Sequence, residues 1–174
     1  MKYKRCMSFS LVFVAITSFL GGISVGQSPL AHLKVTSTRR ATETEQPRMS
    51  AYTAEKWIVR FRLEISADQG AYLLVLGPKG STPLGYALER LSGNIVWQDT
   101  VTGRGRPESP GIARLANEPG ARWIFLPPSA AYEWEIVTEY PETQADKSRS
   151  VFVRKDMTCA ATEVVSPWYS LDRR

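Results

Sequence analysis

Histidine and cysteine are scarce in this sequence of 174 residues. The one histidine is His32, and the two cysteines are Cys6 and Cys159. With so few of these side chains, an imidazole-ligated zinc or copper site, a thiolate cluster and a His-dependent catalytic triad are all disfavoured. We therefore predict no metal site, no cofactor and no catalytic residues.

Long apolar runs are also lacking, apart from Phe9–Val25, which follows the basic start Met1–Arg5. A basic start, an apolar run and a small-residue exit before Gln27 predict a signal peptide over residues 1–26. The run contains Ser, Thr and two Gly, and it is shorter than the ~20 residues that usually span a bilayer. We expect a secreted protein, or one of the periplasm or cell envelope. It would contact a membrane only if this segment stays uncleaved.

A strong excess of charge is absent as well. The 22 Lys and Arg residues face 17 Asp and Glu residues, and three of the basic ones (Lys2, Lys4, Arg5) belong to the predicted signal peptide. The remaining 19 basic residues nearly balance the 17 acidic ones, so we expect no nucleic-acid partner. Cleavage would leave Cys159 alone, either as a free thiol or as a link between two chains.

The segment after the signal peptide has few large apolar side chains and is rich in Ser, Thr, Arg, Glu and Gln. Such a composition buries too little surface to offset the entropy of ordering. We predict a flexible tether over residues 27–53. An ordered domain is expected over residues 54–156, and a C-terminal tail over 157–174 that can pack on it.

The clearest pattern in the chain is the alternation over 57–65. Trp57, Phe61 and Ile65 alternate with charged residues such as Arg60 and Arg62, as in a strand with one buried face. Similar patterns recur about every ten residues, and no stretch has a convincing helical period. The prediction is an all-β domain: a single antiparallel β-sandwich, or a partly open barrel, of about six to eight strands.

The charges on the outer face of the expected strand 57–65 indicate which strand lies beside it. Its outer face is basic, whereas the outer face of the expected strand 132–139 carries Glu133, Glu135 and Glu139. Like charges opposite one another in a sheet are unfavourable, so antiparallel pairing of the two strands would replace two repulsive rows by cross-strand ion pairs. We expect the two strands to be neighbours, with Trp57, Phe61, Tyr132 and Trp134 sharing one core.

A hairpin over 85–100 provides the candidate binding residues. With Gly93-Asn94 at its tip, Arg90 would lie opposite Trp97 and Leu88 opposite Asp99, with Tyr86 on the same face. The predicted ligand-binding residues are Tyr86, Arg90, Trp97 and Asp99. A flat aromatic patch with polar edges suits a sugar ring or a protein surface. A half-buried tryptophan capped by the arginine is the structural alternative.

These observations favour an exported, non-catalytic β-sandwich module that binds a protein or a glycan. The alternative is a small carbohydrate hydrolase built on two carboxylates, which need a separation of ~5 to 9.5 Å. The acidic residues available to it on strands are Glu64, Glu89, Asp99, Glu133 and Glu135.

Overall fold

The computed structural model describes residues 30–42, 45, 56–77, 82–91, 94–99, 105–106, 112–139 and 146–171. The side chains at 91, 97–99, 105, 106 and 139 are not described. The predicted signal peptide, 1–26, lies outside these ranges. In the part of the chain that is described, no helix is long and apolar enough to cross a membrane.

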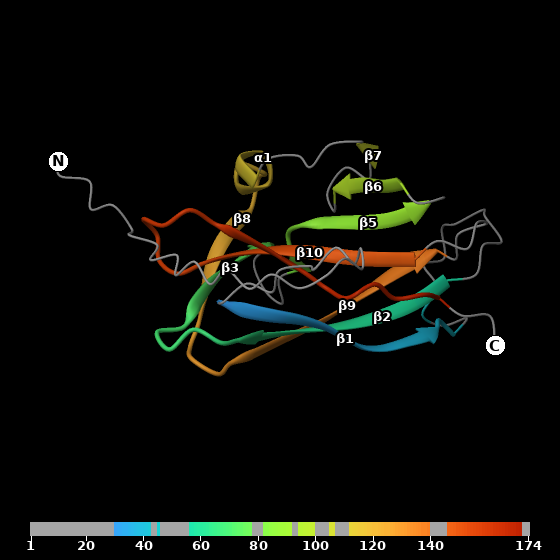
Figure 1. Ribbon diagram of the computed structural model, residues 1–174, viewed down its shortest axis with the longest axis horizontal. Coiled ribbons are helices and arrows are strands. Elements are labelled where there is room, and N and C mark those ends of the chain that lie inside the picture. Colours follow the sequence, from blue (N-terminus) through green and yellow to red (C-terminus); the bar gives the residue numbers. More distant parts are fainter. Residues whose placement is uncertain are drawn as a thin grey trace, which may run out of the picture.

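The described strands form two antiparallel sheets that face one another, which confirms the predicted sandwich (Figure 1). The smaller sheet has the strand order β1-β2-β9, with β1 at Ala31–Arg40, β2 at Lys56–Ile65 and β9 at Ala131–Glu139. The larger sheet contains eight strands: β3 (Ala71–Leu76), β4 (Thr82–Pro83), β5 (Tyr86–Leu91), β6 (Asn94–Asp99), β7 (Gly105–Arg106), β8 (Ala121–Leu126), β10 (Asp146–Arg154) and β11 (Thr162–Val165). One short helix, α1 (Ile112–Ala116), precedes β8.

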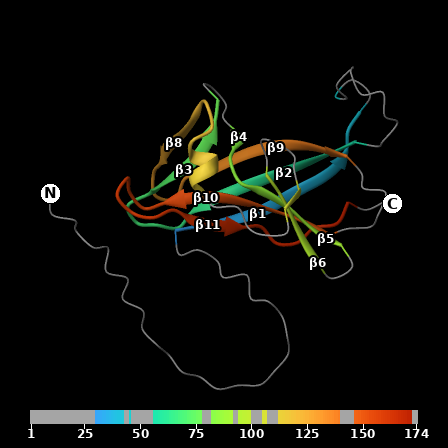
Figure 2. The same ribbon diagram turned by 90° about the horizontal axis from the view of Figure 1, so that it is seen from above.

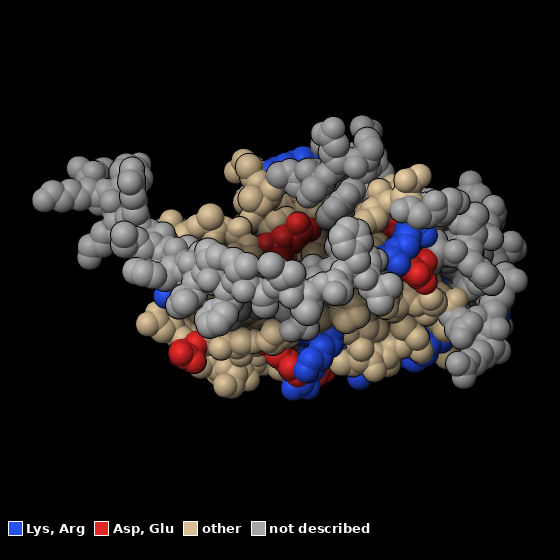
Figure 3. Space-filling view, viewed as in Figure 1, with Lys and Arg blue, Asp and Glu red and all other residues tan. Residues whose placement is uncertain are grey.

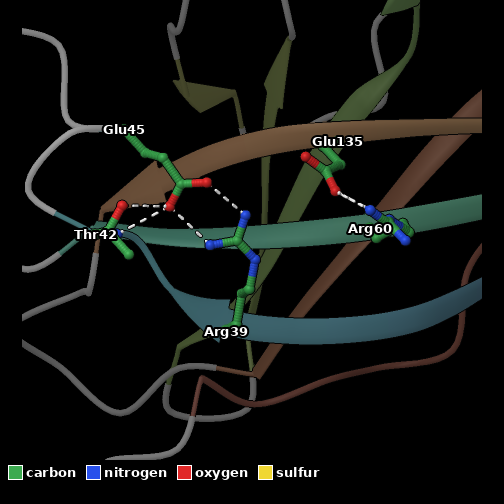
Figure 4. A network of polar contacts seen from close by, with 5 residues as sticks. All are labelled: Arg39, Thr42, Glu45, Arg60 and Glu135. Carbon is green, nitrogen blue, oxygen red and sulfur yellow. Dashed lines mark hydrogen bonds and ion pairs between the residues drawn. The ribbon is translucent and has the colours of Figure 1, made fainter.

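The centre of the smaller sheet is β2, and its pairing with β9 is as predicted. Arg60 pairs with Glu135 and Arg62 with Glu133 in the antiparallel register. The Arg60 Nη2 atom lies 2.6 Å from a carboxylate oxygen of Glu135, and the Arg62 Nη1 atom lies 2.8 Å from one of Glu133 (Figure 4 shows the first pair). In the space-filling view, basic and acidic groups lie next to one another on the surface (Figure 3).

The inner face of the smaller sheet supplies the main core. Val59, Phe61 and Leu63 are fully buried, and the Phe61 ring stacks on Trp134 at 5.4 Å between centroids. Trp57 and Tyr132 are partly buried and pack against the same cluster. The four aromatic residues predicted to share a core therefore do so.

Residues 31–40 form the strand β1, so the prediction of a flexible tether was wrong for them. The strand pairs with β2 along almost its whole length, with Ala31 opposite Ile65 and Arg40 opposite Trp57. Only its first residues, among them Ala31 and Leu33, are buried in the core, whereas residues from 36 to 40 are exposed. At its far end, Arg39 donates two hydrogen bonds to Glu45, which also accepts from Thr42 (Figure 4).

The centre of the larger sheet is β10. Along one edge it pairs first with β5 and then with β3; along the other it pairs with β11 and, through a single bridge, with Tyr169. Figure 2 shows β11 beside β10. Where the chain passes from β4 to β5, a Cβ on Gly85 would lie 1.8 Å from the carbonyl oxygen of Ser150, so only glycine fits there.

The two faces of β10 have different surroundings. Val151 and Val153 belong to the main core between the sheets, whereas Phe152 packs on the opposite face with Tyr86, Leu84 and Leu115 of α1. Asp146–Arg149 are polar in sequence, yet they are the first residues of β10. The predicted tail includes β11, and its Val164 and Leu171 are buried in the main core.

Candidate functional site

The predicted hairpin exists, but its register differs from the expected one. Asn94 does not belong to the turn as predicted, because it pairs with Leu91. Leu88 therefore lies opposite Trp97, Arg90 opposite Ile95, and Tyr86 opposite Asp99. The side chains of Trp97 and Asp99 lie outside the described part, so their role in a binding patch stays a prediction.

Tyr86 and Arg90 have separate environments. Tyr86 is completely buried, with its ring edge-on to Phe152 at 5.7 Å, so its assignment to an exposed patch was wrong. Arg90 is partly exposed, and its guanidinium lies 4.3 Å from the ring centre of Trp168. The aromatic partner of Arg90 thus comes from the C-terminal segment, and a tryptophan capped by arginine is present at a different position from the one predicted.

An open groove of about 510 Å³ lies beside Trp168, between β1 and the C-terminal segment. The walls consist of small hydroxyl residues, one lysine and two aromatic residues: Lys34, Val35, Thr36, Ser37, Thr38, Pro167, Trp168, Tyr169 and Ser170. This groove was not predicted, because residues 27–53 were assigned to a flexible tether. The adjacent aromatic residues Trp168 and Tyr169 after Pro167 were a signal that could have indicated it.

A second, smaller and more enclosed space of about 50 Å³ lies between the two sheets, with Tyr169 as a wall common to both spaces. Its walls come from β5, β9, β10 and the C-terminal segment: Ala87, Leu88, Glu89, Ile136, Thr138, Lys147, Ser148, Arg149 and Tyr169. We call this space the basic pocket, because it contains two of the few buried cations of the described chain, Lys147 and Arg149.

Lys147 is compensated within the basic pocket. Its ammonium donates a hydrogen bond of 2.9 Å to Glu89 and a longer one of 3.4 Å to the Thr138 hydroxyl. Backbone hydrogen bonds in both directions join Lys147 to Tyr169, which fixes the C-terminal segment beside β10. This cation therefore has a carboxylate partner and a defined position.

Arg149 has no such partner among the described residues. Its side chain faces the smaller sheet, with the guanidinium carbon 5.9 Å from the ring centre of Phe61, and only 6% of the residue is exposed. The buried Nε atom has no hydrogen-bond acceptor in the described part of the protein. Burial lowers the pKa of Arg149 to about 10, so the guanidinium is still charged at neutral pH.

Tyr169 lies next to this charge. Its ring is edge-on to Phe61 at 5.8 Å, on the same side of the smaller sheet as Arg149. Burial raises the pKa of Tyr169 to about 12, so its hydroxyl remains a neutral hydrogen-bond donor. The basic pocket therefore combines one compensated cation, one uncompensated cation and a protonated phenol.

The carboxylates considered for a hydrolase are engaged in ion pairs where their side chains are described. Glu133 and Glu135 pair with Arg62 and Arg60, and Glu89 pairs with Lys147. Glu64 pairs with both Lys34 and Arg62, which lowers its pKa. No group of three or more His, Cys, Asp or Glu side chains suited to a metal is present in the described ranges.

The position of His32 differs from expectation, whereas Cys159 is a free cysteine in the described chain. His32 lies in β1, opposite Glu64, so the sandwich contains an imidazole that we had assigned to a tether. Its Nδ1 atom is buried without a hydrogen-bond partner among the described residues. Cys159 is partly exposed, and its thiol lies 3.3 Å from a carboxylate oxygen of Asp156.

Comparison with known proteins gives a likeness of fold alone. No family model and no curated protein matches the sequence. One similar crystal structure is that of a Bordetella pertussis protein assigned as ApaA, with a TM-score of 0.49 and 11% identity over 84% of this chain and 96% of that one. Another is the structural genomics target SoR45, with a TM-score of 0.42 and 14% identity over 81% and 85% of the two chains. We draw no functional argument from either.

Proposed function

We propose that the protein is an exported, non-catalytic binding module whose groove beside Trp168 binds a glycan. The observation that carries this proposal is the composition of the groove, in which an aromatic ring held by Arg90 lies beside a row of hydroxyl residues. A sugar offers an apolar ring face and a rim of hydroxyls. Stacking on the indole and hydrogen bonding to Thr36, Ser37 or Ser170 would satisfy both.

A protein ligand is disfavoured at the adjoining edge of β1. The register between β1 and β2 shifts between Val35 and Ser37, which makes Thr36 a bulge, and its hydroxyl bonds to the carbonyl of Arg60. Bulges and exposed cations such as Lys34 and Arg39 are features that protect an edge strand from pairing with another chain. Strand addition is therefore a poor use of this edge.

The hydrolase alternative has no specific observation in its favour. Each described carboxylate that it would use is already hydrogen-bonded to a Lys or Arg side chain of the protein. Export, on which the proposal also depends, rests on the sequence of residues 1–26 alone.

A glycan array with the chain starting at Gln27 tests the proposal. For glycans that bind, Trp168→Ala should weaken binding roughly tenfold or more, since a tryptophan that the ligand covers is often a dominant contact of a binding site. Arg90→Gln should weaken it less, by releasing the indole ring. Phe125→Ala is the matched control, because Phe125 is an exposed aromatic residue that does not line the groove.

Two outcomes would contradict the assignment. Binding that is insensitive to Trp168→Ala but lost in Trp97→Ala would return the site to the predicted hairpin patch. A protein captured in place of any glycan would keep the module and replace the ligand class.

A further inference from the structure

Arg149 has an unusual position for a charged side chain. A buried cation is normally compensated by a carboxylate or by several hydrogen bonds, since an uncompensated charge in the interior is strongly unfavourable. Arg149 is almost completely buried, and within the described chain it has neither a carboxylate partner nor an acceptor for its Nε–H group. Arg149 is also among the residues that line the basic pocket.

The charges around the basic pocket indicate which kind of ligand would compensate the positive charge of Arg149. Lys147 and Glu89 already form an ion pair, so their charges cancel. Arg149 contributes one further positive charge, and among the described residues Glu89 is the only carboxylate that lines the space. A single negative charge would make the pocket neutral, whereas a dianion such as phosphate would leave an excess beside Glu89.

The volume of the basic pocket and the hydrogen-bond donors that line it further restrict which anion would fit. A volume of about 50 Å³ is room for roughly three to five water molecules, which is enough for a small planar group. A guanidinium presents paired N–H groups that match the two oxygens of a carboxylate. The protonated phenol of Tyr169 and the hydroxyl of Thr138 are further polar groups from neighbouring elements.

We propose that the basic pocket is a binding site for a carboxylate group, held by Arg149 and assisted by Tyr169. This inference does not depend on the glycan proposal, because it rests on residues between the sheets and not on the groove. Tyr169 lines both spaces, so the pocket adjoins the groove.

Calorimetry or NMR titration of the chain starting at Gln27 with sodium acetate tests this site. The comparison anions are sulfate and chloride at equal ionic strength. We expect saturable binding of acetate in preference to both, together with shifts of the resonances of Arg149, Tyr169 and Thr138. Binding of all three anions alike, or no saturable binding of acetate, would overturn the proposal.

Substitution separates the pocket from general attraction by charge. Arg149→Met keeps an unbranched, flexible side chain and removes the charge and the N–H donors, so acetate binding should fall at least about tenfold. Arg149→Lys keeps the charge but loses the paired donors, so its affinity for acetate should lie between those of the wild-type protein and Arg149→Met. Arg60→Met is the matched control, because it removes an exposed arginine from the outer face and should leave acetate binding unchanged.

Competition identifies the source of the carboxylate. Glucuronate presents it on a sugar, and N-acetylglycine presents it as the end of a peptide. The compound that displaces acetate at the lower concentration indicates whether the natural carboxylate belongs to a sugar or to a peptide. If neither compound displaces acetate, the ligand is a free small carboxylate. Unchanged acetate binding in folded Arg149→Met would refute the site whichever compound competes.

Discussion

The outer face of the smaller sheet and the interior of the sandwich use arginine in opposite ways. Arg60 and Arg62 are exposed, and each has a glutamate across the β2–β9 ladder. Arg149 is buried between the sheets and has no acidic partner among the described residues. Exposed pairs contribute little to stability but select a neighbouring strand, whereas an uncompensated buried cation lowers stability and is retained for another reason. For Arg149 we propose that this reason is a ligand.

Among the changes that test these interactions, removal of β1 should reduce the stability of the sandwich most. A chain that starts at Ser50 loses the buried side chains of Ala31 and Leu33 and leaves the edge of β2 unpaired. We expect loss of cooperative unfolding in urea, since the change rivals the ~5–15 kcal/mol that stabilises a typical small domain. A chain that starts at Leu30 is the control and should unfold like one starting at Gln27. If the chains starting at Ser50 and at Leu30 unfolded with equal cooperativity, β1 would be dispensable for folding.

Arg149→Met should raise stability, the reverse of the usual effect of changing a buried residue. In buffer without carboxylates we expect the free energy of unfolding to increase by about 1–4 kcal/mol, because an apolar side chain replaces an uncompensated buried charge. Arg60→Met on the outer face should lower it by about 0–1 kcal/mol. A large loss of stability in Arg149→Met would show that the guanidinium is compensated within the protein.

Loss of a carboxylate sharpens the same contrast. Glu89→Gln leaves Lys147, a mostly buried cation, without its ionic partner, and should destabilise by roughly 1–3 kcal/mol. Glu135→Gln makes the same chemical change on the exposed face and should cost about 0–1 kcal/mol. Urea unfolding of the two variants side by side gives the difference. Equal effects would mean that water reaches both pairs alike.

Sequence patterns were most informative where a strand has one buried and one charged face. For β2 and β9 the alternation identified the inward-facing aromatic residues, and the opposite charges of the outer faces identified the partner strand. Both signals are local, and both arise from side chains that report directly on their surroundings.

The same patterns failed where burial and polarity do not coincide. The outer half of β1 is polar because it lies at an edge and is exposed, so its composition resembles that of a flexible segment. Asp146–Arg149 resemble a loop because they are polar, yet Lys147, Ser148 and Arg149 are buried. The basic pocket depends on these residues, so no rule that places polar residues outside could have found it.

The smallest expected effect concerns the outer face, where the pairing between β2 and β9 can be tested directly. Changing Arg60 and Arg62 to Glu would place four acidic side chains opposite one another and should destabilise by about 1–2 kcal/mol, given ~0.2–1 kcal/mol for each cross-strand pair. Changing Glu133 and Glu135 to Lys in the same protein would restore opposite charges in the observed register, so most of the loss should return. High salt should shrink both changes, because exposed charges are screened over a Debye length of ~10 Å at 0.1 M. If the fourfold variant showed the sum of the two separate losses instead of recovery, the ion pairs would have no energetic coupling, and the alternating apolar rows alone would set the register.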